Sequence, residues 1–301
     1  MLRFLHLFLA LLISHLSIGQ LIDNMKGAAF NSEMYFNETF LKLNRIENIT
    51  VSFAMKRTGR PIENKPDLKI FSFNENGQLI KIDAITSILS KIDSSHIAID
   101  RNELGLISQR TEASKRGFTS TLFEYDSKGN VIKTENKTSE NESDDKLKLI
   151  SGLQYSINSE TYQYSEPDGM TLQKQCFNNY GLPFATNRVI REPSGYIVRE
   201  ENEQTIGGKS IHILYSYNEH GWISEKKSIN PQKPETPLRQ ELFLYDKYGN
   251  LTGFKVYSNG KLIRDLEVIY TPTFFIDAVL DQDMSTKDIL ISRYTYQFKK
   301  S

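Results

Sequence analysis

The sequence predicts a mainly β protein: an up-and-down antiparallel meander of repeated hairpins, forming a curled or open sheet. Three observations predict this fold: five copies of one turn motif, a rhythm of about 13 residues between turns, and large apolar side chains that alternate on the flanking strands. Short N-terminal and C-terminal helices are expected to cap the sheet and cover its edges.

Each copy of the turn motif consists of an aromatic residue, Asp or Asn, two variable residues and glycine. The Asp or Asn side chain can accept a hydrogen bond from the backbone N–H two residues on, and the glycine supplies the positive φ that closes the turn. Four copies have a second aromatic residue two positions before the first, and the exception has Gln175 there. The predicted turn residues are Asn74 and Gly77, Asp126 and Gly129, Asn178 and Gly181, Asn218 and Gly221, and Asp246 and Gly249.

The spacing of the turns indicates how the hairpins are joined. The five glycines are 52, 52, 40 and 28 residues apart, which are close to multiples of 13 or 14. A step of that length corresponds to one strand of about 8 or 9 residues and a turn of about 4. An α/β alternation would need longer units with helical periodicity between strands. The spacing therefore predicts consecutive antiparallel strands.

Two copies of the motif carry a family resemblance. Residues 123–131 read Phe-Glu-Tyr-Asp-Ser-Lys-Gly-Asn-Val, and residues 243–251 read Phe-Leu-Tyr-Asp-Lys-Tyr-Gly-Asn-Leu. Their tyrosine, aspartate, glycine and asparagine resemble the YD-repeat family of RHS-type wall-associated and toxin proteins. Residues 257–262 are similar to the short MORN-type hairpin repeat. The YD resemblance covers scattered units between about 69 and 270. It implies a curled sheet that encloses a cargo, or a ligand-binding stalk.

The two ends of the chain differ from the repeats. Residues 1–19 are predicted to be a signal peptide, because Arg3 precedes an apolar run and small residues precede a cut before Gln20. A short helix is expected between Asn31 and Leu43. Thr273 is expected to cap a second helix, from Phe274 to about Asp283.

The sequence thus divides into five parts. They are the signal peptide (1–19), the N-terminal helix with the first part of the meander (20–135), a polar loop or linker (136–148), the second part of the meander (149–270), and the C-terminal helix with a closing strand (271–301).

The composition excludes some classes of binding partner. Lys plus Arg equals Asp plus Glu, at 37 each, so no overall field would attract nucleic acid. The protein is expected to be exported, to the periplasm, the cell surface or the medium, with no membrane span after signal removal. A glycan or another envelope protein is a candidate partner. Cys176 is the only cysteine, and the simplest interpretation is a small core residue.

No catalytic residue, metal ligand or cofactor is predicted. The histidines outside the signal peptide lack the spacing of a zinc site. Glycosidases use paired carboxylates, and Glu200, Glu201 and Glu203 cluster on one predicted strand. A salt-bridged solvent face explains that cluster more simply.

Aromatic residues supply the candidate ligand contacts: Trp222, Tyr215, Tyr217, Phe243 and Tyr245. The four rings besides Trp222 belong to ladders that would form the core under a second layer, or a platform for sugar rings. Trp222 follows a turn glycine and would point away from Ile223, so it is exposed if Ile223 is buried.

These features predict an exported β-repeat protein with a binding or structural role in the envelope or outside the cell. They do not assign a specific biochemical activity to it. One alternative is a carbohydrate-binding or carbohydrate-active protein. Another is a periplasmic carrier with an apolar cavity. A flat sheet with exposed aromatic rings would favour glycan binding, whereas a closed sheet with an apolar lumen would favour a carrier.

Overall fold

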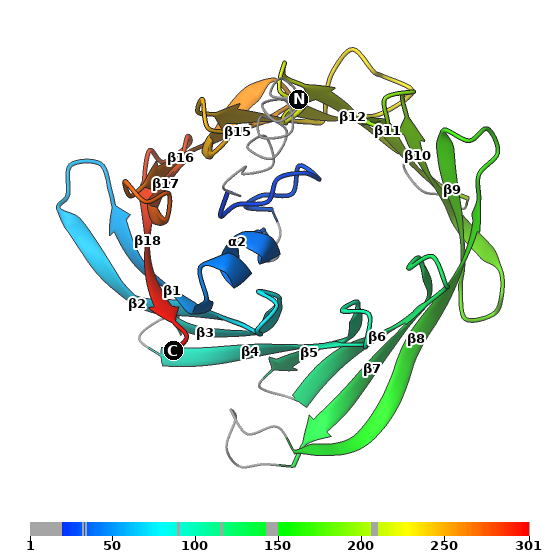
Figure 1. Ribbon diagram of the computed structural model, residues 1–301, viewed down its shortest axis with the longest axis horizontal. Helices are drawn as coiled ribbons and strands as arrows, with labels where there is room; N and C mark the ends of the chain where they lie inside the picture. Colours follow the sequence, from blue (N-terminus) through cyan, green and yellow to red (C-terminus); the bar gives the residue numbers. More distant parts are fainter. Residues whose placement is uncertain are drawn as a thin grey trace, which may run out of the picture.

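The chain folds into one closed β-barrel. The computed structural model describes residues 20–31, 33, 35–88, 91–114, 117–142, 150–205 and 210–300, so the predicted signal peptide lies outside the described residues. Within these ranges 18 strands form a single antiparallel sheet. Each strand pairs with the next along the chain, and β18 pairs back with β1 (Figure 1). The predicted up-and-down meander is confirmed, and its sheet is closed.

The strands have lengths typical of a regular barrel wall, and β18 is the closing strand predicted within residues 271–301. The strands are β1 Ile46–Lys56, β2 Ile62–Phe73, β3 Leu79–Ile88, β4 Lys91–Arg101, β5 Ile107–Ser114, β6 Gly117–Tyr125, β7 Val131–Asn141, β8 Ser151–Ser165, β9 Thr171–Phe177, β10 Pro183–Arg191, β11 Ile197–Gln204, β12 Ile211–Tyr217, β13 Ile223–Ile229, β14 Arg239–Tyr245, β15 Leu251–Ser258, β16 Lys261–Tyr270, β17 Ile276–Asp283 and β18 Ile289–Phe298.

Side chains alternate between the lumen and the outer wall, as the pleat of a strand requires. In β1, Ile49 and Val51 are buried in the lumen, and Ser52 is exposed on the outside. In β15, Phe254 and Val256 belong to the core, so Lys255 between them faces outward. The barrel therefore has its apolar core inside, and its outer wall carries charged and polar side chains together with apolar ones such as Leu244 and Ile269.

Asp246 shows how the hairpin tips close. Its carboxylate accepts hydrogen bonds from the backbone N–H of Tyr248 and of Asn250, and from the Asn250 side chain, at 2.8 to 2.9 Å. Gly249 adopts a φ of +90°, which a side chain would strain. Asp126 forms the equivalent three bonds in its own tip.

Successive tips lie at opposite ends of the barrel, because the strands run alternately up and down. The end that carries most of the motif copies is called the glycine rim, and its tips contain Gly77, Gly105, Gly129, Gly195, Gly221 and Gly249. The tip with Gly181 lies at the opposite rim.

The position of Gly181 explains why its copy of the motif departs from the others. The chain runs around the barrel in one direction, so hairpins at the two rims point opposite ways along the barrel axis. To keep that direction, a hairpin at the opposite rim must be turned over, and the face that lies inside at the glycine rim then lies outside. Phe243 and Tyr245 precede a glycine-rim tip and face the lumen. The matching residues Gln175 and Phe177 pair with outward-facing Thr186 and Thr161. The position of Gln175 therefore faces outward and does not need the aromatic core residue that the other copies have there.

Tyrosine hydroxyls tie neighbouring hairpins together just inside the glycine rim. In each case the hydroxyl donates to a backbone carbonyl close to the preceding tip, over 2.7 to 3.0 Å. These latches are Tyr125 to Ile107, Tyr164 to Val131, Tyr217 to Ile197, Tyr245 to Ile223, Tyr270 to Leu251, and Tyr296 to Ile276. Burial raises the pKa of Tyr245 to about 12, so this hydroxyl keeps its proton and donates at neutral pH.

The assignment to the YD-repeat family is wrong. The hairpins belong to one closed barrel and not to a repeat array. The shared letters have a local cause: aspartate and glycine close the tip, asparagine bonds the aspartate, and tyrosine forms the latch. Residues 257–262, which suggested a MORN-type repeat, are a tight turn between β15 and β16, with positive φ at Asn259 and Gly260.

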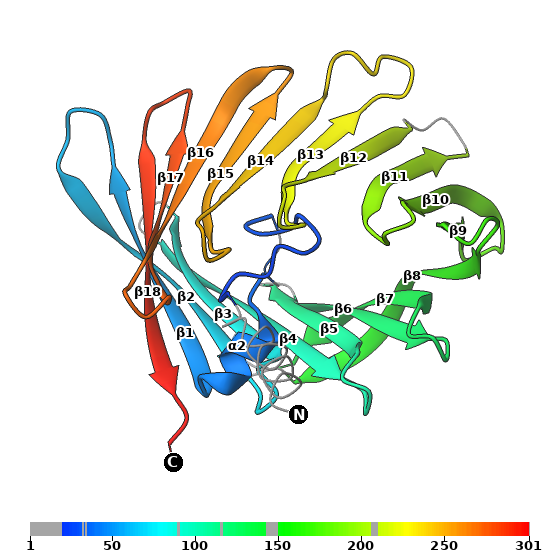
Figure 2. The ribbon, with the colours of Figure 1, turned by 45° about the horizontal axis from the view of Figure 1, so that its top comes forward.

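The N-terminal helix is shorter than predicted and does not cap an edge. It is α2, Glu38–Leu43, with Asn37 as N-cap accepting a bond from the Phe40 N–H. Figure 1 and Figure 2 show α2 and the chain before it inside the barrel. The described residues between 20 and 45 are called the luminal segment. No helix in the described part of the chain is long and apolar enough to cross a membrane.

The predicted C-terminal helix is also wrong, because most of its residues form β17. Phe274 has a φ of +65° and lies in the turn, whose Thr271 hydroxyl accepts a bond from the Phe275 N–H. β17 then pairs with both β16 and β18. The apolar residues that suggested a helix are buried equally well in a strand, and pairing on both sides satisfies the backbone.

The predicted polar linker begins within a strand. Asn136–Asn141 forms the second half of β7 and pairs with both β6 and β8. The rest of the predicted linker, from residue 143 onward, lies outside the described residues.

Candidate functional site

The predicted ligand contacts on β12 and β14 face the lumen. Phe243 is 3% exposed and stacks on Phe254, with ring centroids 5.1 Å apart, so it is part of the core. The Tyr215 hydroxyl donates to the Glu200 carboxylate over 3.1 Å. Tyr217 and Tyr245 are latches near the glycine rim, each with one side of its ring against a second aromatic residue.

Trp222 lies along the glycine rim and covers the next tip. A Cβ on Gly249 would come within 2.6 Å of the Trp222 ring, and a Cβ on Gly221 within 2.2 Å of the Tyr196 hydroxyl. Gln78 and Leu106, which also follow a tip glycine, contact the glycine of the next tip in the same way. The residue after each of these glycines therefore packs tip against tip, and at two neighbouring positions that residue is aromatic.

A cavity of about 780 Å³ opens beside these rings, within the range of about 300–1,000 Å³ that is typical of ligand sites. We call it the rim cavity. One wall comes from the tips of β10 to β15 and the other from the luminal segment. Its lining includes Tyr196, Tyr217, Trp222, Tyr245 and Tyr248, with Asp23, Glu38 and Arg191 as charged groups. Three of the five predicted ligand contacts thus meet in one cavity.

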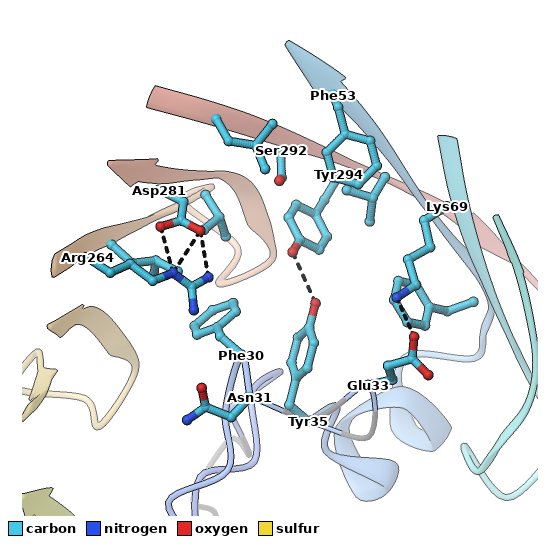
Figure 3. A pocket seen from close by; sticks show the side chains of 15 residues that line it. Phe30, Asn31, Glu33, Tyr35, Phe53, Lys69, Arg264, Asp281, Ser292 and Tyr294 are labelled. Carbon is cyan, nitrogen blue, oxygen red and sulfur yellow. Dashed lines mark hydrogen bonds and ion pairs between the residues drawn. The ribbon is translucent and has the colours of Figure 1, made fainter. Parts of the chain in front are cut away.

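A second cavity, of about 350 Å³, lies inside the barrel between the luminal segment and β1, β2 and β16 to β18 (Figure 3). We call it the interior cavity. Its floor is apolar and consists of Val51, Phe71, Leu266 and Val279, each 3% exposed or less.

Two ion pairs flank the interior cavity. Arg264 of β16 donates hydrogen bonds from two guanidinium nitrogens to the Asp281 carboxylate of β17, at 2.6 and 2.7 Å. On the other side, Lys69 of β2 binds Glu33 of the luminal segment at 2.8 Å. Figure 3 shows both pairs at the sides of the cavity. Because these charges are paired with one another, the apolar floor is the main surface offered to a ligand.

Tyr35 and Tyr294 join the luminal segment to the wall of the interior cavity. Their hydroxyls are 3.1 Å apart, and both side chains are buried. Burial raises the pKa of both phenols, so both stay protonated at neutral pH. Sequence reasoning missed these residues. The available signal was an aromatic-rich run, Phe30 to Phe40, between the signal peptide and the first strand.

The acidic cluster on β11 lies on the outer wall and is engaged in ion pairs. Arg188 binds Glu201 at 3.2 Å and Glu203 at 3.0 Å, and Arg199 binds Glu201 at 2.9 Å. Glu200 points to the opposite face, so it does not form a carboxylate pair with its neighbours. His212 brings a ring nitrogen within 4.8 Å of the Glu201 and Glu203 oxygens, but the two arginines already neutralise this cluster.

Cys176 is buried on the luminal side of β9, opposite Tyr162. Burial raises the pKa of the Cys176 thiol, which keeps it protonated and weakly nucleophilic.

Comparison with known proteins finds distant structural similarities. No protein-family model matches the sequence, and no curated protein does. The chain is similar to a porin-like protein from Bacteroides uniformis, at 7% identity and a TM-score of 0.41, over 84% of this chain and 98% of that one. It is also similar to a porin-like protein from Bacteroides vulgatus, at 10% identity and a TM-score of 0.32, over 82% and 97%. A third match, the Photorhabdus luminescens Tc holotoxin pore, has 12% identity and a TM-score of 0.23, over 79% of this chain and 15% of that one.

Proposed function

We propose that the protein is an exported carrier, which stands in water in the cell envelope or outside the cell and holds an apolar or amphipathic small molecule inside its barrel. The observation that carries this proposal is the interior cavity, whose floor is apolar and whose flanking charges are paired. Export rests on the predicted signal peptide at residues 1–19.

The outer wall supports a water-facing barrel. A barrel embedded in lipid presents an apolar band about 25 Å tall on its outside. Here charged pairs lie on the outer face on several sides of the barrel. They include Lys133 with Glu124, Arg188 with Glu201, and Lys255 with Asp265, at 2.7, 3.2 and 3.1 Å. The last two of these pairs lie in the middle of their strands, where burying a Lys or Arg in hydrocarbon would cost about 2–4 kcal/mol.

The lumen supports a ligand of limited size. The luminal segment packs against β1, β2 and β14 to β18, as the core cluster shows, so the barrel is partly filled from within. The remaining interior cavity, about 350 Å³, is at the low end of the range for small-molecule sites. A closed barrel with an apolar lumen favours a carrier, whereas a flat sheet would have favoured a glycan-binding protein.

Binding of the apolar dye N-phenyl-1-naphthylamine tests this function, because the dye becomes fluorescent when it leaves water. The purified protein should enhance its fluorescence saturably. Ser292→Phe places a ring in the interior cavity, which Ser292 lines, and should weaken dye binding at least tenfold. Ser52→Phe is the matched control, because Ser52 is exposed on the outer face of the neighbouring strand β1.

The wild-type protein and both variants should have the same circular dichroism spectrum. Absence of saturable dye binding to the wild type would contradict the carrier function. So would a Ser292→Phe variant that is folded and binds the dye as tightly as Ser52→Phe does.

A further inference from the structure

The rim cavity differs from the interior cavity in its chemistry. Tyr196 and Tyr217 are in contact, with ring centroids 4.7 Å apart, and Trp222 and Tyr245 are 5.3 Å apart. These two pairs come from neighbouring tips and line one cavity together with Tyr248. The aromatic character is local, because the corresponding position after Gly77 is Gln78 and the one after Gly105 is Leu106.

Exposure distinguishes this aromatic wall from core. Tyr248 is 61% exposed and Tyr196 is 41% exposed, whereas Phe243, on the same strand as Tyr245, is 3% exposed. Rings that only served to pack the barrel would be covered. Tyr196 and Tyr248 are therefore open to a ligand that approaches from solvent.

Polar groups of both signs stand beside the rings. Asp23 uses one carboxylate oxygen to accept from the Met25 N–H, at 2.9 Å. Arg191 donates from one guanidinium nitrogen to the Gly195 carbonyl, at 3.0 Å. Gln20 and Thr39 add an amide and a hydroxyl. Glu38 also lines the cavity, and its carboxylate is paired with Arg101 at 3.4 Å. The cavity therefore offers donors and acceptors together, and the charges of Asp23 and Arg191 are opposite in sign.

We infer that the rim cavity is a saccharide-binding site, separate from the carrier site in the barrel interior. A pyranose ring has an apolar C–H face that packs on an aromatic ring, and its edge carries hydroxyls that both donate and accept. The aromatic pairs supply the first surface, and Asp23 and Arg191 supply partners for the hydroxyls. A volume of about 780 Å³ accommodates a short oligosaccharide.

An organic cation is the competing ligand, because rings of tyrosine and tryptophan also attract quaternary ammonium groups. Of the two carboxylates in the lining, Glu38 is paired with Arg101 at 3.4 Å, and the Arg191 guanidinium offsets the charge of Asp23, so a cation meets no net attraction. A neutral, hydroxyl-rich ligand fits both the rings and the mixed charges, so the saccharide is the better match.

Trp222 is the only tryptophan in the chain, so its fluorescence reports directly on this cavity. Titration of the purified protein with cellohexaose, chitohexaose and maltohexaose should change that fluorescence saturably for at least one of the three. Tyr248→Ala should weaken the response at least tenfold. Tyr180→Ala is the matched control, because Tyr180 holds the same position in the Gly181 tip at the opposite rim and is 80% exposed.

Calorimetry with the saccharide that binds, on Trp222→Ala, provides a second readout that does not depend on the fluorophore, and affinity should again fall at least tenfold. Ser292→Phe should leave saccharide affinity unchanged, which separates this site from the carrier function. The inference is overturned if none of the three saccharides binds, if choline binds in their place, or if binding survives both Tyr248→Ala and Trp222→Ala.

Discussion

Asn24 of the luminal segment donates a hydrogen bond from its side-chain nitrogen to the Tyr245 hydroxyl, over 2.7 Å. The same hydroxyl donates to the Ile223 carbonyl over 2.9 Å. Asn24 also accepts from the Ala29 N–H and is only 7% exposed. One tyrosine thus joins two hairpins of the wall to each other and to the chain inside the barrel.

Tyr245→Phe should therefore destabilise the protein more than the removal of an ordinary latch. Tyr164→Phe is the matched control, because Tyr164 donates only to the Val131 carbonyl. A net cost of about 1 kcal/mol is expected for the control. The Tyr245 variant also leaves the Asn24 amide without its partner, which adds about 1–3 kcal/mol for a buried donor. Urea unfolding measures both, and equal losses would show that the bond to Asn24 contributes nothing.

Gly77→Ala should loosen the luminal segment from the rim. A Cβ at Gly77 would lie 2.1 Å from the Glu38 carbonyl oxygen and 2.8 Å from the Lys42 nitrogen, both backbone atoms at the two ends of α2. Gly181→Ala is the control, because its φ of +72° is close to the +76° of Gly77 and no atom lies within 4 Å of its Cβ. The control should lose about 1–2 kcal/mol from backbone strain alone.

The Gly77 variant should lose clearly more than the control, and protease cleavage should begin between residues 20 and 45. Equal unfolding midpoints for the two variants, with the same cleavage pattern, would mean that α2 does not need its contact with the rim.

Local parts of this fold were predictable because local chemistry decides them. Asp246 and Gly249 close their tip through bonds within five residues, and Tyr294 and Tyr296 alternate with polar residues along β18. Closure was not predictable in this way. It depends on the pairing of β1 with β18, nearly the whole chain apart, and no local pattern specifies such a contact.

In the candidate sites, too, features set by the local sequence were predictable and features set by distant contacts were not. Trp222 was recognised as unusual from its place after a turn glycine, but its packing on Gly249 depends on how neighbouring tips meet around the rim. An apolar cavity was among the alternatives, but its residues were not predicted, because Glu33 and Lys69, or Tyr35 and Tyr294, meet only when the luminal segment enters the barrel. Phe274 to Asp283 was predicted as a helix because its apolar residues suit either structure, and pairing with two strands decided the outcome.

Asp283 should make stability depend on pH in acid. Hydrogen bonds from the Ser285 hydroxyl, and from the N–H groups of Ser285 and Thr286, lower its pKa from 3.8 to about 2. Because the folded pKa is below the unfolded one, this carboxylate stabilises the fold above about pH 4, and the contribution is lost as pH falls towards 2.

Thermal unfolding of the wild type and of Asp283→Asn measures this effect. The wild type should melt higher at pH 6, and the difference should shrink between pH 4 and pH 2. Glu235→Gln, in the exposed connection between β13 and β14, is the control and should show no such convergence. A difference for Asp283→Asn that stays constant across this range would contradict the assignment.

The outer wall leads to the last prediction: the purified protein should remain soluble without detergent and should not float with phosphatidylethanolamine–phosphatidylglycerol vesicles in a density gradient. Lys255 and Asp265, paired at 3.1 Å on the outer face, represent the groups that would have to enter hydrocarbon. Replacing both with leucine removes the pair and should increase vesicle binding. The double variant Lys26→Leu/Asp23→Leu, in the luminal segment, makes the same change in charge away from the outer wall and should not. Wild-type protein that floats with vesicles and needs detergent would contradict a water-facing barrel, because it would require lipid contact at these charged positions.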